Sequence, residues 1–158
     1  MLTRCYDPNY LIKYPTYKHC EVCDEWLDYQ EFALWIDPYL TENKKGWHLD
    51  KDLLFKGNKI YSPETCVLVP EEINLILGNK GFSSELPVGV TKSKVHSKFM
   101  ATLNENGKPR YLGIFNTPEE ASSCYIINKE LQVRAVAEQW KDSIDFRLYT
   151  VLSNFKIN

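Results

Sequence analysis

Residues 98–121 constrain the fold more than any other part of this chain, because strand, turn and helix signals follow one another there. Residues 98–104 and 110–115 alternate between apolar and polar side chains, and Asn106-Gly107 between them is typical of a hairpin turn. Thr117, Pro118 and Glu120 then supply a cap, a first-turn proline and a glutamate three residues after the cap. With a third extended segment at residues 88–92, the pattern predicts a three-stranded antiparallel sheet packed on a helix.

The alternation also predicts which side chains leave the sheet on the side away from the helix. Phe99, Ala101 and Leu103 are expected to face the helix, so their neighbours point outward. Lysine and arginine on such a face neutralise phosphates, while arginine, asparagine and threonine reach base edges. The candidate DNA-binding residues are Thr91, Lys92, Lys94, Lys98, Met100, Thr102, Asn104, Lys108 and Arg110.

Charge is distributed unevenly along the chain, although its formal net charge is only -2. Residues 1–81 hold 9 Lys/Arg and 13 Asp/Glu, a net charge of -4, whereas residues 82–158 hold 10 and 8, a net charge of +2. Residues 86–112 hold five basic side chains and one acidic one, a net charge of +4. A basic stretch of this kind favours nucleic-acid binding, and a merely solvated face is the alternative.

The same region resembles a known DNA-binding family over residues 86–135. Tyr111-Leu112-Gly113-Ile114-Phe115, followed by Thr117-Pro118-Glu119-Glu120-Ala121, is similar to the apetala/ethylene-response-factor (ERF) domain. The resemblance implies that the sheet lies in the major groove and that outward residues of its three strands contact DNA. Thr91 and Thr102 stand where that family usually has charged residues, and Gly113 is expected where strand and helix approach closely.

The first half of the chain predicts a helix followed by two extended segments and a second helix. Residues 1–22 are expected to be irregular or extended, and residues 24–36 carry one apolar helical stripe. Strands are expected at residues 47–54 and 61–69, and a helix with Pro70 at its first position ends at Gly78.

This half resembles the HNH nucleases, which fold as a ββα unit (the His-Me finger) and bind one divalent metal. The resemblance rests on Leu49-Asp50-Lys51-Asp52, on residues 61–70 and on Asn74. It implies that Asp50 and Asn74 bind Mg²⁺ or Mn²⁺ through oxygen atoms. Lys51 falls on the position of the general-base histidine, and Cys66 on that of the middle asparagine.

The general base is the open question of this site. Lysine is protonated at neutral pH and is a poor base. His48 shares a strand face with Asp50 and is the substitute, so the candidate catalytic residues are His48, Asp50 and Lys51. In the alternative reading, Asp50 and Asp52 only pair with Lys51 or Lys56.

The five cysteines are expected to be reduced thiols and not a disulfide framework. Cys20 and Cys23 have the spacing of a zinc knuckle, which Cys5 and Cys66 could complete. One knuckle is weak support, so we expect no structural zinc. No apolar run reaches the ~20 residues that span a bilayer, and no signal peptide is recognised. We expect a cytoplasmic protein, in the bacterial host cytosol if a phage encodes it, without a membrane partner.

The sequence therefore predicts an α+β protein with two domains. Residues 1–81 would form a degenerate HNH-like unit with a preceding helix, and residues 82–158 an ERF-type sheet and helix with a further C-terminal helix. The expected function is binding of double-stranded DNA by a protein of the phage HNH homing-endonuclease type, with metal-dependent cleavage left open. The alternative is a non-catalytic regulator or inhibitor that binds DNA, or binds a protein through its acidic N-terminal half.

Overall fold

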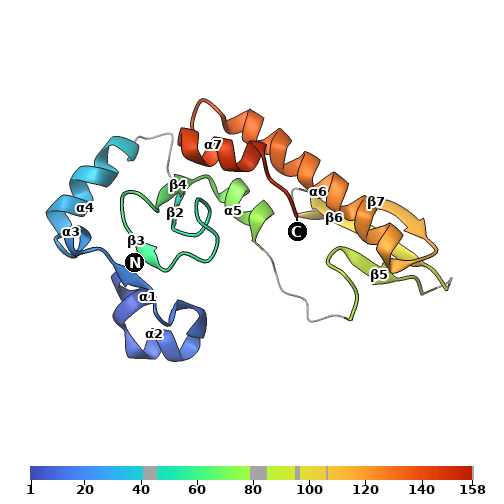
Figure 1. Ribbon diagram of the computed structural model, residues 1–158, viewed down its shortest axis with the longest axis horizontal. Coiled ribbons are helices and arrows are strands. Elements are labelled where there is room, and N and C mark those ends of the chain that lie inside the picture. The colour runs from blue at the N-terminus through green and yellow to red at the C-terminus, as the bar shows by residue number, and fades with distance from the viewer. Residues whose placement is uncertain (41–45, 79–84, 95–96, 106, 158) are drawn as a thin grey trace. The chain divides into compact units, whose positions relative to one another are not determined.

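The computed structural model describes residues 1–40, 46–78, 85–94, 97–105 and 107–157 (Figure 1). Two compact units make up the chain. The first comprises residues 1–74 and 141–151, and the second comprises residues 75–140 and 152–158. The expected boundary between residues 81 and 82 lies outside the described residues.

The N-terminus of the first unit is helical. The chain forms α1 (Leu2–Tyr6), α2 (Pro8–Lys13) and the 3₁₀ turn η1 (Pro15–Tyr17), so the expectation of an irregular or extended start is wrong. The Asp7 carboxylate accepts a hydrogen bond from the backbone N–H of Tyr10 at 3.0 Å, and Pro8 occupies the first turn. Helices this short contain too few turns to show a periodic apolar stripe.

The helix expected at residues 24–36 is divided in two. Its parts are α3 (Asp24–Leu27) and α4 (Tyr29–Ile36), and the 3₁₀ turn η2 (Asp37–Tyr39) follows. Asp28 between them is extended, and its carboxylate accepts the backbone N–H of Gln30 at 2.8 Å. The break therefore comes from an aspartate that caps the second helix, a local competitor of helical hydrogen bonding.

Two short strand pairs lie in the first unit. β1 (Glu21–Val22) pairs in parallel with β3 (Ile60–Tyr61), and β2 (His48–Asp50) pairs antiparallel with β4 (Val67–Val69). Helix α5 (Glu71–Leu77) begins one residue after Pro70, the expected first position, and stops before Gly78, as the sequence predicts. β2 is shorter than expected, because the Asp50 carboxylate accepts the backbone N–H groups of Asp52 and Leu53 and turns the chain away from the ladder.

The core of the first unit joins its N-terminal helices to these strands. Its buried members are Cys5, Cys20, Val22, Trp26, Tyr61 and Cys66. Trp26, only 2% exposed, packs its ring 4.6 Å from that of Trp35 and 5.2 Å from that of Phe32. Contacts between large rings at these separations stabilise the unit beyond the burial of their area.

The second unit contains the predicted three-stranded antiparallel sheet. Its strands are β5 (Val90–Lys92), β6 (Phe99–Glu105) and β7 (Lys108–Phe115), in that order, with α6 (Pro118–Trp140) packed across one face. The predicted capping box is present: the Thr117 hydroxyl accepts the N–H of Glu120 at 3.2 Å, and the Glu120 carboxylate accepts the N–H of Asn116 at 3.1 Å. Of the expected turn, Gly107 has a φ of +78°, whereas Asn106 lies outside the described residues.

The C-terminal helix begins later than expected. The sequence favours a start near Val136, but α6 continues through Trp140 and α7 covers Phe146–Ser153. No glycine or proline interrupts α6 after Pro118, and the Asp145 carboxylate, which accepts the N–H of Arg147 at 2.8 Å, caps the next helix. Within the described residues, we find no helix of the length and apolarity needed to cross a membrane.

Candidate functional site

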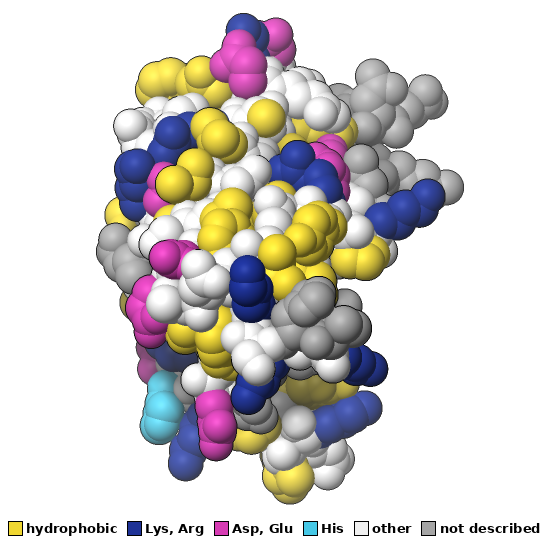
Figure 2. All heavy atoms as spheres, turned by 90° about the vertical axis from the view of Figure 1, so that its right-hand side faces the viewer, with side chains coloured by type: hydrophobic (Ala, Val, Ile, Leu, Met, Phe, Trp, Pro, Cys, Tyr) yellow, Lys and Arg dark blue, Asp and Glu magenta, His cyan; other side chains and the backbone are white. Residues whose placement is uncertain are grey.

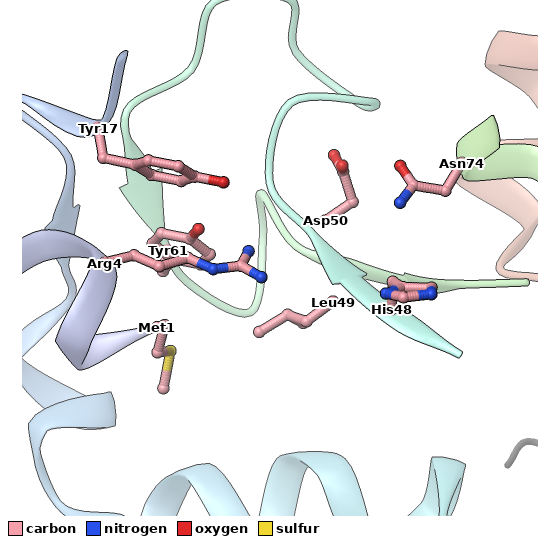
Figure 3. Close-up of a pocket in the computed structure, with 8 residues that line it drawn as sticks. All are labelled: Met1, Arg4, Tyr17, His48, Leu49, Asp50, Tyr61 and Asn74. Atoms are coloured by element: carbon pink, nitrogen blue, oxygen red, sulfur yellow. The ribbon is translucent and has the colours of Figure 1, made fainter. Parts of the chain in front are cut away.

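A pocket of about 300 Å³ in the first unit brings together three of the predicted site residues (Figure 3). His48, Asp50 and Asn74 line it, although up to 26 positions separate them in the sequence. Strand β2 presents His48 and Asp50 on one face, and the first turns of α5 present Asn74. The other lining residues are Met1, Arg4, Tyr17, Leu49 and Tyr61.

Asp50 and Asn74 point toward one another across the pocket (Figure 3). Both hydrogen bonds that Asp50 accepts from Asp52 and Leu53, at 2.7 Å and 2.9 Å, end on Oδ1. That arrangement fixes the carboxylate through one of its two oxygen atoms. A carboxylate held by backbone donors needs no rearrangement to bind a cation, which favours binding.

Lys51 does not line this pocket. Its side chain is buried, and its ammonium group donates to both carboxylate oxygens of Asp52 and to the carbonyl oxygen of Asn58, each at 2.8 Å. The Asn58 carboxamide in turn donates to the Lys51 carbonyl at 2.9 Å. Lys51 therefore holds the loop between β2 and β3, and the pairing of Asp52 with Lys51 expected under the alternative reading is present.

Arg4 is one of the pocket residues that sequence reasoning missed, together with Tyr17 and Tyr61. Its guanidinium lies 5.6 Å from the centre of the Tyr17 ring and is hydrogen-bonded to Tyr61, facing the pocket from the side opposite Asn74 (Figure 3). Burial lowers the pKa of Arg4, but the Tyr61 hydrogen bond and nearby tyrosines outweigh it and raise the pKa overall. A single arginine in a segment expected to be irregular gives no periodic signal that could have identified it.

Tyr61 remains a neutral phenol in this setting. Burial raises its pKa to about 12, even though Arg4 acts in the opposite direction. A protonated hydroxyl can donate a hydrogen bond to an anion in the pocket, beside the permanent positive charge of Arg4. The pocket thus combines a cationic side with an oxygen-rich side.

The donor set suits a hard divalent cation better than zinc. One carboxylate oxygen of Asp50, the carboxamide oxygen of Asn74 and the imidazole of His48 are the donors available, and Mg²⁺ and Mn²⁺ prefer oxygen ligands supplemented by water. In the described part of the chain, this pocket included, no three His, Cys, Asp or Glu side chains converge as a metal-binding group. A cation held here would have one charged protein ligand, Asp50.

The cysteines belong to the core of the first unit, apart from Cys124 on α6. Cys5, Cys20 and Cys66 are buried, and all five thiols are free. Burial raises the pKa of Cys66 to about 11 and also raises that of Cys5. Thiols that stay protonated are poor zinc ligands, and the absence of structural zinc stays a prediction.

The second candidate site is the side of the three-stranded sheet away from α6, which we call the open face. Register and alternation place Thr91, Met100, Thr102, Asn104, Tyr111 and Ile114 on it. Helix α6 packs on the opposite face, where Val90 and Ala101 are buried against Ala121. Four exposed lysines, the bordering lysines, belong to the strands or to the segments next to them: Lys92, Lys94, Lys98 and Lys108. The pairing of Lys92 with Phe99 and of Lys108 with Glu105 places these two on the helix side of the sheet, and not on the open face where the alternation placed them.

Arg110 lies on the helix side of the sheet and not on the open face where the alternation placed it. A register shift between β6 and β7 sets Ala101 opposite Gly113 but Thr102 opposite Tyr111, so Leu112 is an extra residue. Arg110 then falls opposite the buried Leu103. Its guanidinium donates to Asn128 of α6 at 3.3 Å and pairs with Glu105 at 3.3 Å.

The glycine next to α6 is Gly89 and not Gly113. A Cβ atom at Gly89 would overlap the ring of Tyr125 on α6, whereas one at Gly113 would meet the ring of Phe115, 3.0 Å away on the same strand. The glycine required by helix packing therefore precedes β5.

Comparisons of the chain with protein-family models, with curated proteins and with solved structures found no match. The geometry of the pocket and of the open face is therefore the basis on which a function is proposed.

Proposed function

We propose that this chain binds double-stranded DNA through the open face of its three-stranded sheet. The observation that carries the proposal is an uncovered sheet face in the basic part of the chain, with four exposed lysines in its strands and in the segments next to them. A twisted sheet of this width fits the major groove of B-DNA, and lysines at its borders would reach the phosphates on either side.

Figure 2 shows the side of the molecule on which the three strands lie in Figure 1. Lys and Arg side chains are interspersed there with hydrophobic ones and with Asp and Glu. Duplex DNA offers both kinds of partner, because its phosphates are anionic and its base edges carry apolar groups.

Salt dependence of binding tests the proposal. The variant Lys92→Gln, Lys98→Gln, Lys108→Gln should bind a duplex more weakly, and its slope of log affinity against log salt should fall by up to ~2.7, at ~0.9 for each lost phosphate contact. The matched control removes three exposed lysines of the first unit: Lys13→Gln, Lys18→Gln, Lys56→Gln. Equal slopes for the two triple variants would contradict binding through the open face.

A second function, slow metal-dependent cleavage of a phosphodiester, is favoured by the shared pocket of His48, Asp50 and Asn74. A Mg²⁺ or Mn²⁺ ion held by Asp50 and Asn74 would supply positive charge at the phosphate. Arg4 would bind the same phosphate from the other side, and His48 would accept the proton of the attacking water. Lys51 takes no part, because its ammonium group is committed to Asp52 and Asn58.

Nicking of supercoiled plasmid in Mn²⁺ separates this function from binding alone. Slow nicking should be lost in Asp50→Asn and in His48→Ala, and should persist in the surface control Asp37→Asn. Asparagine at position 50 can still accept the two backbone hydrogen bonds, so the loop is retained. If the wild-type chain does not nick, the pocket is no nuclease site, and the non-catalytic DNA-binding or protein-binding regulator is the function to pursue.

A further inference from the structure

We propose that the open face recognises thymine-rich duplexes through apolar contacts with the 5-methyl groups in the major groove. This inference rests on the proposed DNA binding and names the class of sequence that the face would select. It starts from the identity of the side chains that the register shift in β7 brings to the middle of the face.

The centre of the open face is apolar. Cross-strand neighbours on it are Met100 beside Ile114, Thr102 beside Tyr111, and Thr91 beside Met100. Ile114 is 39% exposed and Tyr111 is 58% exposed, so their side chains are available to a partner. Methionine, isoleucine and threonine end in methyl groups, and none of these five side chains carries a charge.

The register shift produces this surface. If Leu112 were paired in a regular ladder, strict alternation would keep Arg110 on the open face and turn Tyr111 toward the helix. With the register shift, Leu112 packs into the core against α6, Tyr111 faces outward, and Arg110 is held by Asn128 and Glu105. The open face therefore carries the ring of Tyr111 and lacks Arg110.

The loss of Arg110 determines which bases the face can read. Guanine is read most often by an arginine or lysine that donates to O6 and N7, and adenine by an asparagine or glutamine. The register places Lys92 and Lys108, like Arg110, on the helix side of the sheet, and Asn104 is the one carboxamide among the described open-face residues. Thymine alone among the four bases presents a methyl group in the major groove, and apolar side chains contact it.

Replacing thymine by uracil in the duplex tests the inference without changing the protein. Uracil keeps every hydrogen-bonding group and every phosphate and lacks only the methyl group. We expect a thymine-rich duplex to bind about tenfold more tightly than its uracil counterpart, from two methyl contacts at roughly the value of a buried methylene each. The slopes against salt should be equal for the two duplexes, because both carry the same charge.

The protein-side comparison is Met100→Ala, Ile114→Ala, with Ile127→Ala on α6 as the control, since Ile127 is exposed on the helix and not on the open face. The double variant should bind both duplexes alike with an unchanged salt slope, whereas the control should keep the preference. Equal binding of the thymine and uracil duplexes by the wild-type chain overturns the inference and leaves DNA binding intact. Failure to bind any duplex overturns DNA binding itself.

Discussion

At the scale of single residues, two neighbours in the sequence, Asp50 and Lys51, have different surroundings. Asp50 faces the pocket, while Lys51 turns inward and is only 4% exposed. Strand β2 ends at Asp50, and in the turn that follows the Lys51 ammonium group donates to Asp52 and to the carbonyl oxygen of Asn58. Sequence similarity alone places Lys51 at a base position, but its neighbours Asp52 and Asn58 give it a structural task.

Replacing Lys51 by methionine should therefore destabilise the chain. The substitution removes hydrogen bonds from a buried ammonium group to a carboxylate and a carbonyl oxygen, so we expect a loss of about 2–3 kcal/mol in the free energy of unfolding. Urea denaturation followed by tryptophan fluorescence measures it. Lys56→Met, at an exposed position in the same loop, should cost less than ~0.5 kcal/mol. Similar stabilities for the two variants would mean that Lys51 is dispensable to the fold.

Asp145 should make stability depend on pH. The hydrogen bonds from Arg147 hold the pKa of this carboxyl below its ordinary value of 3.8. Because the pKa is lower in the folded state, the stabilisation is complete above the ordinary value and is lost as the pH falls through the lowered one. We expect Asp145→Asn to cost about 1 kcal/mol at pH 7. That difference from the wild-type chain should shrink below pH 4, and a difference that stays constant down to pH 2 would exclude this carboxylate as its source.

At the scale of helices and strands, local chemistry decides what could be predicted. The sheet β5–β7 and the start of α6 follow from alternation and from a capping box that is complete within four residues. The division of α3 from α4 and the early end of β2 could not be predicted, because each depends on whether an aspartate side chain caps its own backbone. The register shift at Leu112 could not be predicted from the sequence either, because Tyr111 and Leu112 both suit a strand.

Gly89 provides a test of packing between β5 and α6. Alanine at this position would combine a left-handed φ of +77° with overlap of its Cβ and the Tyr125 ring. We expect thermal or urea unfolding to show a loss of about 2–4 kcal/mol. Gly107→Ala is the matched control, because its φ of +78° imposes the same backbone strain with no atom within 4 Å of the added Cβ. It should cost only about 1 kcal/mol, and equal losses would show that the overlap is relieved at no cost.

At the scale of the whole molecule, the two units are interleaved along the chain. The first unit includes residues 141–151, which follow residues 75–140 of the second unit in the sequence. Helices α5 and α7 each contribute residues to both units. Arg147 of α7 donates to the carbonyl oxygens of Pro63, Glu64 and Cys66 at 3.4, 2.9 and 3.5 Å within the first unit. Dividing the sequence at residue 81 gives no indication that residues 141–151 belong to the first unit, because their contacts with residues 63–66 join segments that are distant in the sequence.

Fragments 1–81 and 82–158 should therefore associate when they are produced separately. The second fragment carries the segment that completes the first unit, so the two should co-elute in size-exclusion chromatography. Arg147→Met should weaken their association about tenfold, by the loss of hydrogen bonds from a charged donor. Arg134→Met is the control, because Arg134 bonds to Glu130 and Phe155 within its own fragment. Fragments that elute apart would contradict the interleaved arrangement.

Because residues 141–151 belong to the first unit, recombination can exchange only certain segments of such a protein without disrupting that unit. A single recombination event near residue 80 would join a foreign sheet-bearing half to a first unit that lacks its α7 segment. The resulting hybrid would expose the carbonyl groups that Arg147 satisfies and would fold poorly. Exchange of the sheet-bearing segment therefore requires two crossovers, one on each side of residues 75–140. The α7 segment is then inherited together with the first unit.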